Sequence, residues 1–168
     1  TRQKRSRVGG VHQGRAQARG RELGQQSGKA LKLFRSVRIV DIVGVGHVGS
    51  RVAESARKLG MEVLLNDPPR EREEGPGLFT PLKLLQRESD IISIHVPLTM
   101  KGPDRTAYLA GEGFLKLLEK KPFIINTARG GVVDEDHLKD HLAAGLLKGA
   151  VVDVWENEPR PDPELIRL

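Results

Sequence analysis

Residues 37–67 constrain the fold of this chain more than any other segment. They open with an apolar run typical of a buried strand, which stops at the glycine-rich turn formed by residues 44–49. A helical pattern follows and ends near Gly60, and a second apolar run, residues 63–65, leads to Asp67. The residues predicted to share the buried face of the helix are Val48, Val52, Ala56 and Leu59. This order of strand, glycine turn, helix, strand and acid is typical of a dinucleotide-binding unit.

The glycine turn has the residue types that binding a pyrophosphate requires. Gly44 allows a tight turn, Gly46 lets the backbone approach the phosphates, and Gly49 lets the helix pack closely on the strand. The free N–H groups at the helix start, where His47 and Val48 lie, favour a phosphate together with the helix dipole. We therefore predict that these five residues bind the cofactor. The alternative is that these glycines form an ordinary turn that binds no cofactor.

Asp67 indicates which dinucleotide is bound. It lies 67 − 46 = 21 residues after Gly46, where a carboxylate can hold both ribose hydroxyls. The same charge would repel a 2′-phosphate, so NAD is favoured over NADP, although Arg70 is near enough in sequence to soften that repulsion. The alternative is that Asp67 only starts a turn before Pro68-Pro69.

The rest of the chain alternates strands and helices. Strands are predicted at 91–95, 123–126 and 149–153, and helices after Thr80, around 114–118, and from a cap at Asp134 to Gly145. Residues 68–77 are predicted to be a loop. The alternation predicts an α/β fold, a doubly wound parallel sheet of Rossmann type that binds ligands at the carboxyl ends of its strands. Asp41, inside the first strand, is unexplained, because burying an unpaired carboxylate is costly.

Length and composition favour one soluble domain. The chain has 168 residues, which is enough to bury a core, and it contains no cysteine. No apolar run reaches membrane-spanning length and no signal-peptide pattern opens the chain, so we expect a cytoplasmic protein with no membrane contact. The first residue is Thr1, which raises the possibility that the chain is a fragment.

The basic charge belongs to the first segment. Residues 1–36 hold ten Lys or Arg and one acid, a net +9, which leaves 6 − 9 = −3 for residues 37–168. Residues 1–30 have no apolar period, so we expect a disordered basic tail at 1–36, followed by an NAD-binding domain at 37–168. A nucleic-acid partner is disfavoured, because the tail has no aromatic residue for stacking bases before Phe34.

Four motifs carry a resemblance to a known family. They are GVGHVG at 44–49, HVPLT at 95–99, INTARGGVVDEDHL at 125–138 and GAVVDVWENEP at 149–159. With them the chain resembles the D-isomer-specific 2-hydroxyacid dehydrogenases over residues 37–159. NDPPR at 66–70 and HVPLTMKGPDRTAYLA at 95–110 resemble more narrowly the erythronate-4-phosphate dehydrogenase subfamily of the vitamin B6 pathway.

The resemblance implies roles for two catalytic residues. Arg129 would hold the substrate carboxylate in two charge-assisted hydrogen bonds, and Glu158 would orient a catalytic histidine and raise its pKa. Alone, Arg129 could be a surface arginine and Glu158 a helix-start carboxylate. That histidine should follow Glu158, but the last histidine here is His141. We therefore expect it, and the substrate domain of the family, to lie outside this chain. His95 is not assigned a catalytic role.

The resemblance also extends the cofactor site. Asp153 would face the nicotinamide carboxamide, Val96 and Pro97 the adenosine side, and Thr127 and Ala128 would complete the site from the loop before Arg129. Asp153 could alternatively be a strand-end cap. We assign no metal ligand. The implied cofactor is NAD, the implied partner a small 2-hydroxy acid, and the implied full-length enzyme a homodimer.

Three functions stay open. The first is an NAD-binding domain of an enzyme that moves a hydride between a 2-hydroxy acid, most simply 4-phosphoerythronate, and the nicotinamide. The second is another dehydrogenase of the family, of phosphoglycerate or glyoxylate type. The third is an NAD-sensing protein like the corepressors that share the fold, which is disfavoured because a sensor needs neither Arg129 nor Glu158.

Overall fold

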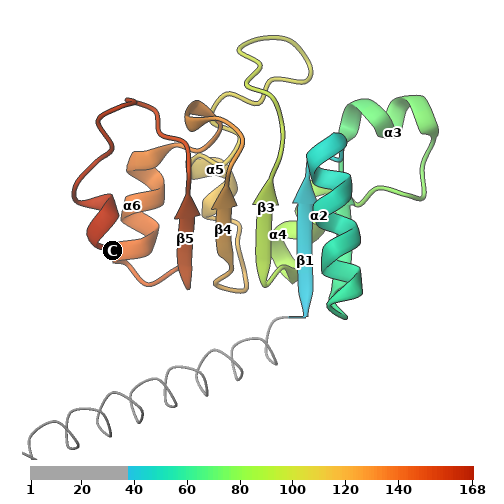
Figure 1. Cartoon of the computed structure of the whole chain (residues 1–168), viewed down its shortest axis with the longest axis horizontal. Helices are drawn as coiled ribbons and strands as arrows, with labels where there is room; N and C mark the ends of the chain where they lie inside the picture. Colours follow the sequence, from blue (N-terminus) through green and yellow to red (C-terminus); the bar gives the residue numbers. More distant parts are fainter. Residues whose placement is uncertain (1–37) are drawn as a thin grey trace, which may run out of the picture. The chain divides into compact units, whose positions relative to one another are not determined.

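The computed structural model describes residues 38–168, so the basic tail predicted for residues 1–36 lies outside the described part. Five strands form one all-parallel sheet in the order β2-β1-β3-β4-β5 (Figure 1). They are β1 (Ile39–Val43), β2 (Glu62–Asn66), β3 (Ile91–Ile94), β4 (Phe123–Asn126) and β5 (Gly149–Val152). The three later strands lie where the apolar runs predicted them, within one residue at each end.

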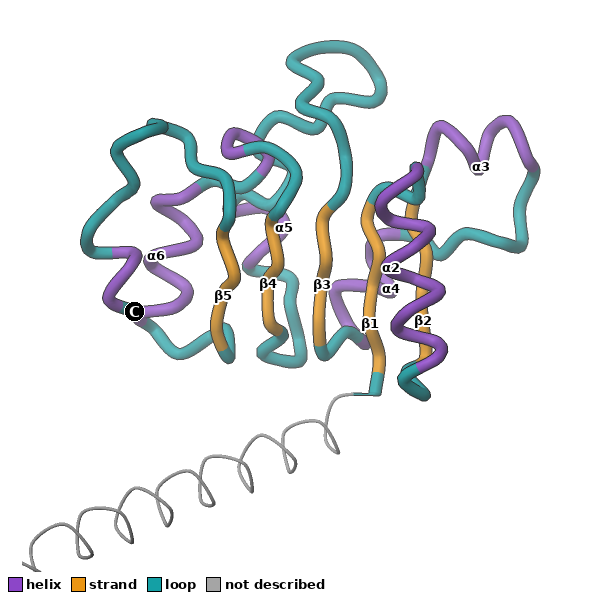
Figure 2. Tube along the Cα trace, viewed as in Figure 1, coloured by secondary structure: helices purple, strands orange, loops and turns teal. Residues whose placement is uncertain are grey.

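Helices cover both faces of the sheet (Figure 2). They are α2 (His47–Lys58), α3 (Pro68–Glu74), α4 (Leu82–Glu88), α5 (Glu112–Leu115) and α6 (Glu135–Ala143), with short 3-10 turns η1 (Gly130–Val132) and η2 (Leu165–Arg167). One buried cluster joins α2 to the face of β1 that carries Val40 and Ile42. Another joins α4, α5 and α6 to the opposite face, through Leu85, Phe114 and Leu138. The predicted doubly wound α/β fold is confirmed. Among residues 38–168, no helix has the length and apolar character needed to cross a bilayer.

The predicted buried face of α2 is confirmed for Ala56, and Val52 is partly buried against β1, but it was wrong for Val48 and Leu59. The buried residues are Gly49, Ala53 and Ala56, whereas Val48 and Leu59 are 61% and 69% exposed. The reason is the close packing at the start of the helix, where a Cβ on Gly49 would overlap the carbonyl oxygen of Gly44. Gly49 must therefore face the strand, and this rotates the adjacent Val48 outward. The predicted end of the helix is confirmed, because Gly60 follows it with φ +81°.

Helix α3 occupies residues predicted to be a loop. Asp67 caps it by accepting a hydrogen bond from the backbone N–H of Arg70 at 3.2 Å, and prolines occupy its first two positions. Arg70 pairs with Glu74 one turn later, at 2.6 Å, before Gly75 ends the helix with φ +92°. Two prolines predict a loop in this segment, but proline is also favoured in the first turn of a helix. Helix α5 is also shorter than predicted and begins earlier, at Glu112.

The order of the strands creates a crevice at one edge of the sheet. From β1 the chain crosses to β2 on one side, and then to β3 on the other side of β1. The connections that leave the carboxyl ends of β1 and β3 therefore diverge, as they do at the ligand-binding switch point of open α/β sheets. Val43 aligns with Asn66 of β2 and Ile94 of β3, so these three strands end at one level.

Asp41 is buried in the middle of β1. It is 0% exposed, and neither of its carboxyl oxygens meets a hydrogen-bond partner within residues 38–168. It lies on the same face of the strand as Val43, which packs into the cluster with α4, α5 and α6. Burial, reinforced by the negative charge of Asp90 and opposed by Lys120, raises the pKa of Asp41 to about 8.

We predict that Asp41 makes the stability of the domain depend on pH. The unfolded chain releases this proton near pH 4 and the folded chain only near pH 8, so the free energy of unfolding falls between these values. The slope from this group is at most about 1.4 kcal/mol per pH unit. Urea unfolding at about pH 5 and about pH 9 should show a loss in the natural chain that Asp41→Asn lacks. Parallel pH dependence in the two proteins would contradict the prediction.

Candidate functional site

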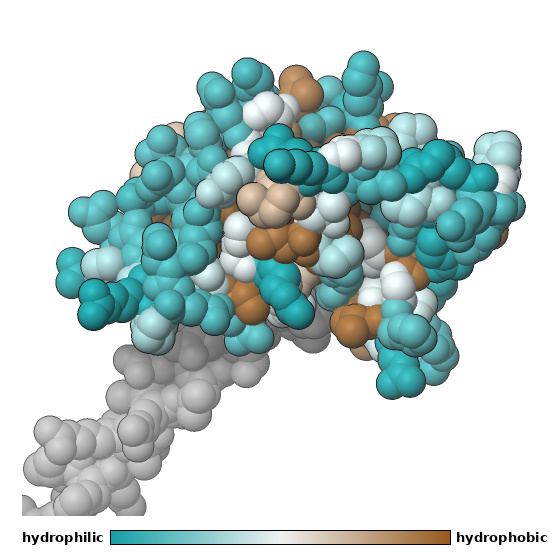
Figure 3. All heavy atoms as spheres, turned by 90° about the horizontal axis from the view of Figure 1, so that it is seen from above, coloured by the Kyte–Doolittle hydropathy of each residue, from teal (hydrophilic) through white to brown (hydrophobic). Residues whose placement is uncertain are grey.

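A cavity of about 470 Å³ opens at the switch point of the sheet, within the size range of ligand sites. Its walls come from the glycine turn after β1, the end of β2 with the start of α3, and the loop after β3. The sequence-predicted residues that line it are Gly44, Gly46, Asp67, Val96 and Pro97. Figure 3 looks onto this edge, where apolar atoms gather at the centre inside a mostly polar surface.

The glycine turn fits a dinucleotide pyrophosphate. Gly44 has φ +91°, and a Cβ there would lie 2.8 Å from the backbone carbon of His95. A Cβ on Gly46 would meet no atom of the described chain within 4 Å, so this backbone faces open space. No side chain among residues 38–168 caps α2. Its first-turn N–H groups, which include those of His47 and Val48, remain available for an anion.

Asp67 is held in place by two backbone groups. One carboxylate oxygen accepts a hydrogen bond from the N–H of Val45 at 2.8 Å, and the other from the N–H of Arg70 at 3.2 Å. Asp67 therefore starts α3, as its alternative interpretation indicates, and it also lines the cavity. Each oxygen keeps a second lone pair for a ligand hydroxyl. The bond to Val45 links the acid directly to the glycine turn.

The loop after β3 forms the opposite wall. Val96 and Pro97 lie here beside His95, which also lines the cavity. The ring nitrogen Nε2 of His95 lies 2.9 Å from the hydroxyl of Ser93. Burial lowers the pKa of His95, which favours the neutral ring. Sequence analysis assigns no catalytic role to His95, and the structure places it in the wall of this cavity.

Arg129 lies at the same edge, after β4, in a turn organised by Asn126. The side chain of Asn126 accepts a hydrogen bond from the N–H of Ala128 at 3.1 Å and donates one to the carbonyl of Arg129 at 3.0 Å. The guanidinium of Arg129 is exposed and donates to the carbonyl of Ala128 at 2.7 Å. Sequence analysis missed Asn126. The available sequence signal was an asparagine at the end of an apolar strand, and in the structure this asparagine is buried.

Asp153 and Glu158 follow β5. The N–H of Asp153 donates to the carbonyl of Asn126 at 3.0 Å, and its side chain is exposed. Glu158 accepts a hydrogen bond from the N–H of Trp155 at 3.0 Å, within its own turn. Gly130 packs against this turn, since a Cβ on it would lie 2.6 Å from the backbone nitrogen of Glu156. The structure thus brings the segments of Arg129 and Glu158 together.

Two glutamates connect the loop that contains Glu158 to the start of α6 by hydrogen bonds. Glu135 and Glu156 each accept a hydrogen bond from the other's backbone N–H, at 2.6 and 2.9 Å. Glu156 also accepts a hydrogen bond from the hydroxyl of Tyr108 at 3.1 Å. Burial raises the pKa of Glu135, and the bond to Glu156 raises that of Tyr108. Sequence analysis did not identify these three residues as a group.

The predicted site residues form two groups rather than one. The cavity holds five of them, whereas Arg129, Asp153 and Glu158 lie farther along the edge and do not line it. The remaining predicted residues that do not line the cavity are His47, Val48, Gly49, Thr127 and Ala128. Gly49 is buried against Gly44, so its contribution is to the shape of the turn.

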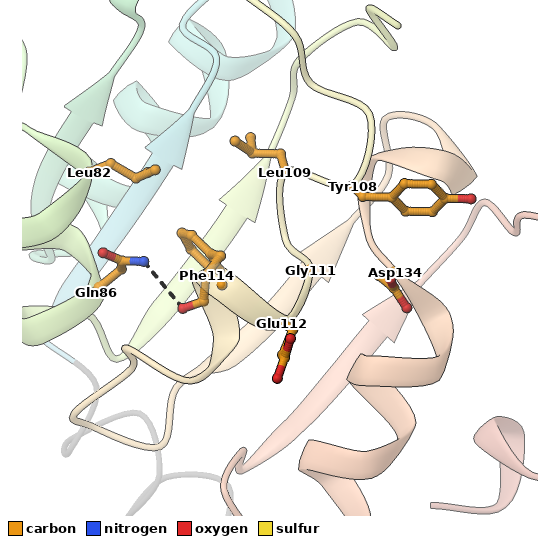
Figure 4. A pocket seen from close by; sticks show the side chains of 9 residues that line it. Leu82, Gln86, Tyr108, Leu109, Gly111, Glu112, Phe114 and Asp134 are labelled. Carbon is orange, nitrogen blue, oxygen red and sulfur yellow. Dashed lines mark hydrogen bonds between the residues drawn. The ribbon is translucent and has the colours of Figure 1, made fainter.

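A second hollow, of about 440 Å³, lies between α4, α5 and the loop before α5 (Figure 4). Gln86 donates to the carbonyl of Phe114 at 3.2 Å on one side, and Tyr108 and Asp134 lie on the other. It holds none of the residues predicted for the site. Among residues 38–168, no group of three or more His, Asp or Glu residues is arranged to hold a metal ion.

Comparison with known proteins gives a family match. The model of the D-isomer specific 2-hydroxyacid dehydrogenase family, NAD binding domain, matches residues 7–168, which extends the resemblance beyond residues 37–159 at both ends. Erythronate-4-phosphate dehydrogenase from Bacteroides thetaiotaomicron is 46% identical over 127 residues, covering 76% of this chain and 36% of that protein. The enzyme of that name from Salinibacter ruber is 47% identical over 133 residues, covering 77% and 34%.

Solved structures give the same result. D-lactate dehydrogenase from Aquifex aeolicus, complexed with NAD and lactic acid, superimposes with a TM-score of 0.64 at 32% identity, covering 80% of this chain and 42% of that chain. The chain spans about a third of the length of the curated relatives it matches. The glycine turn, the acid after β2 and the all-parallel sheet agree with this match. The chain therefore belongs to the D-isomer-specific 2-hydroxyacid dehydrogenase family, as its NAD-binding domain.

Proposed function

We propose that this chain is the NAD-binding part of an enzyme that oxidises 4-phosphoerythronate, a 2-hydroxy acid, in pyridoxine biosynthesis. The observation that carries the proposal is the common edge of the sheet, where the cofactor cavity and the segments of Arg129 and Glu158 lie at the ends of successive strands. The relatives at 46% and 47% identity, which are named erythronate-4-phosphate dehydrogenases, support this choice of substrate. When bound, NAD supplies the acceptor for the hydride that leaves C2 of the substrate.

The cavity residues hold the cofactor in this proposal. The first-turn N–H groups of α2 bind the pyrophosphate beside Gly46, where the backbone is open. Asp67 accepts hydrogen bonds from the ribose hydroxyls with its remaining lone pairs. Val96 and Pro97 pack against the adenosine. Thr127, Ala128 and Asp153 extend the site towards the nicotinamide.

Arg129 and Glu158 act on the substrate side. The exposed guanidinium of Arg129 binds the substrate carboxylate through two parallel hydrogen bonds, which orients C2. Glu158 holds a histidine that takes the hydroxyl proton. The proposal assigns this base to the rest of the enzyme, since the chain spans about a third of the length of its relatives and residues 159–168 contain no histidine. We further propose a cytoplasmic, homodimeric full-length enzyme. The alternative is that the enzyme is another dehydrogenase of the family. The match to D-lactate dehydrogenase supports this alternative, but its sequence identity is lower than that of the erythronate-4-phosphate dehydrogenases.

Asp67 provides the direct test of the cofactor site. Asp67→Asn keeps an oxygen to cap α3 but removes the charge that binds the ribose hydroxyls, so NAD affinity should fall about tenfold or more. Calorimetric titration of the folded chain with NAD measures this loss. Asp134→Asn is the matched control, because Asp134 caps α6 in the same way and lies outside the cavity. Equal NAD affinity in all three proteins would refute the assignment of Asp67.

Gly130 tests the packing that brings Arg129 and Glu158 together. Gly130→Ala places a methyl group against the backbone of Trp155 and Glu156, which should lower the free energy of unfolding by about 1–3 kcal/mol. In Gly131→Ala, the new Cβ meets Leu98 at an ordinary 3.6 Å, and the loss should stay within about 0.5 kcal/mol. Urea unfolding of both variants measures the difference. Two equally stable variants would mean that this contact does not constrain the loops.

Turnover should require more than residues 1–168. We expect the chain to bind NAD yet form no measurable NADH from 4-phosphoerythronate. General base catalysis contributes about 10²–10⁴-fold, and Glu158 is placed to hold a base rather than to act as one. Alignment of the reactants between two domains adds up to about 7–11 kcal/mol. Absorbance assays should compare this chain with a longer protein that includes a following histidine. Rapid turnover by the short chain, abolished by Arg129→Ala, would show that the base is already present.

A further inference from the structure

Helix α3 contains two arginines within five residues of Asp67, and each of them forms an ion pair with an acidic side chain. Arg70 pairs with Glu74 at 2.6 Å, and Arg72 pairs with Asp104 at 2.6 Å. The sequence suggested that Arg70 would soften the repulsion between Asp67 and a 2′-phosphate. The structure makes Arg72 the relevant cation, because Arg72 lines the cofactor cavity and Arg70 does not.

Arg70 is fully engaged outside the cavity wall. Its guanidinium donates to both oxygens of Glu74 and to the carbonyl of Val45, and it lies 5.5 Å from the centre of the Phe79 ring. These contacts fix it beneath the glycine turn. A phosphate in the cavity would have to compete with all of them for this cation.

Arg72 is engaged by one residue, which comes from the opposite wall. One of its guanidinium nitrogens lies 2.7 and 2.6 Å from the two carboxylate oxygens of Asp104. Asp104 belongs to the loop after β3, and both residues line the cavity. This loop is closed at its base, because the N–H of Thr106 donates to the carbonyl of Thr99 at 2.9 Å. Its outer part reaches towards α3 in Figure 1.

We propose that Asp104 is a specificity-determining residue, which keeps the site selective for NAD by occupying Arg72. The inference rests on the proposed placement of the adenosine ribose at Asp67. A 2′-phosphate on that ribose would lie on the wall that Asp67 and Arg72 share, and a free arginine there would bind it through a bidentate, charge-assisted contact. Asp104 instead occupies one of the guanidinium nitrogens that such a contact would use, and its charge offsets that of Arg72. Selectivity thus has two parts, repulsion by Asp67 and removal of an attractive cation by Asp104.

The position of Asp104 explains why sequence analysis did not identify it. It lies 104 − 67 = 37 residues after Asp67, in a segment with no regular structure. Arg105, beside it, also lines the cavity, but it belongs to the loop after β3 and not to α3. Releasing Arg72 therefore adds a cation on the wall of Asp67, where the chain otherwise presents only the acid.

The test is a comparison of NADP and NAD binding to the full chain, by calorimetry at fixed ionic strength. Asp104→Asn frees Arg72 and should raise the ratio of NADP to NAD affinity by roughly threefold to tenfold, since the pair is partly exposed. The ratio of affinities for 2′,5′-ADP and AMP should rise in parallel, because these probes isolate the 2′-phosphate. The gain should shrink as salt is added.

Two variants separate this effect from a structural role of the loop. The double variant Asp104→Asn with Arg72→Gln should lose the gain, because the freed cation is gone. Glu74→Gln frees Arg70 outside the cavity and should leave the ratio unchanged. An unchanged ratio in Asp104→Asn, an equal loss of both cofactors, or a gain that survives Arg72→Gln would overturn the proposal.

The result for Asp67→Asn separates a failure of the proposed ribose placement from a failure of the proposed role of Asp104. If Asp67→Asn changes neither affinity while the chain still binds NAD, the placement of the ribose fails, and with it the reason to expect an effect at Asp104. If Asp67→Asn weakens NAD binding but Asp104→Asn leaves the ratio unchanged, the cofactor site stands and only the role of Asp104 is refuted.

Discussion

The contact between Gly44 and Gly49 is the constraint on which the cofactor site depends. A Cβ on Gly49 would overlap the carbonyl oxygen of Gly44, so strand and helix can only meet this closely with glycine there. That contact sets the rotation of α2, whose first residue follows Gly46 in the cavity wall. It also places the N–H of Val45 within 2.8 Å of Asp67. The start of α2 and Asp67, for which we propose pyrophosphate and ribose binding, are therefore positioned by one piece of backbone packing.

The fold could be predicted from the sequence because its signals are local. Apolar runs set β3, β4 and β5, and Asp134 caps α6 as predicted, by accepting from the N–H of His137 at 3.1 Å. The errors arose where tertiary contact overrides local pattern. Hydrophobic periodicity chose Val48 and Leu59 for the buried face of α2, but close packing at Gly49 decided it. Two prolines suggested a loop where, after the cap at Asp67, they begin α3.

The candidate site was predicted less fully than the fold. Residues at strand ends could be named, because the carboxyl edge of a parallel sheet is where ligands bind. Contacts between distant loops gave no sequence signal. The pairing of Glu135 with Glu156 joins residues 156 − 135 = 21 positions apart, and that of Arg72 with Asp104 joins residues 104 − 72 = 32 positions apart. Neither pair forms a periodic pattern, so only the folded chain reveals them.

Asp41 and Asp67 show why charged groups of this fold belong at the edge of the sheet. Asp67 follows β2, where a turn and a helix start supply two backbone N–H groups for its oxygens. Asp41 lies in the middle of β1, between β2 and β3, where the strand ladders use the backbone N–H groups. Its oxygens find no partner within residues 38–168, and burial raises its pKa to about 8, so the proton stays on at neutral pH. A carboxyl group in this sheet can therefore serve as a charged ligand only where a strand ends.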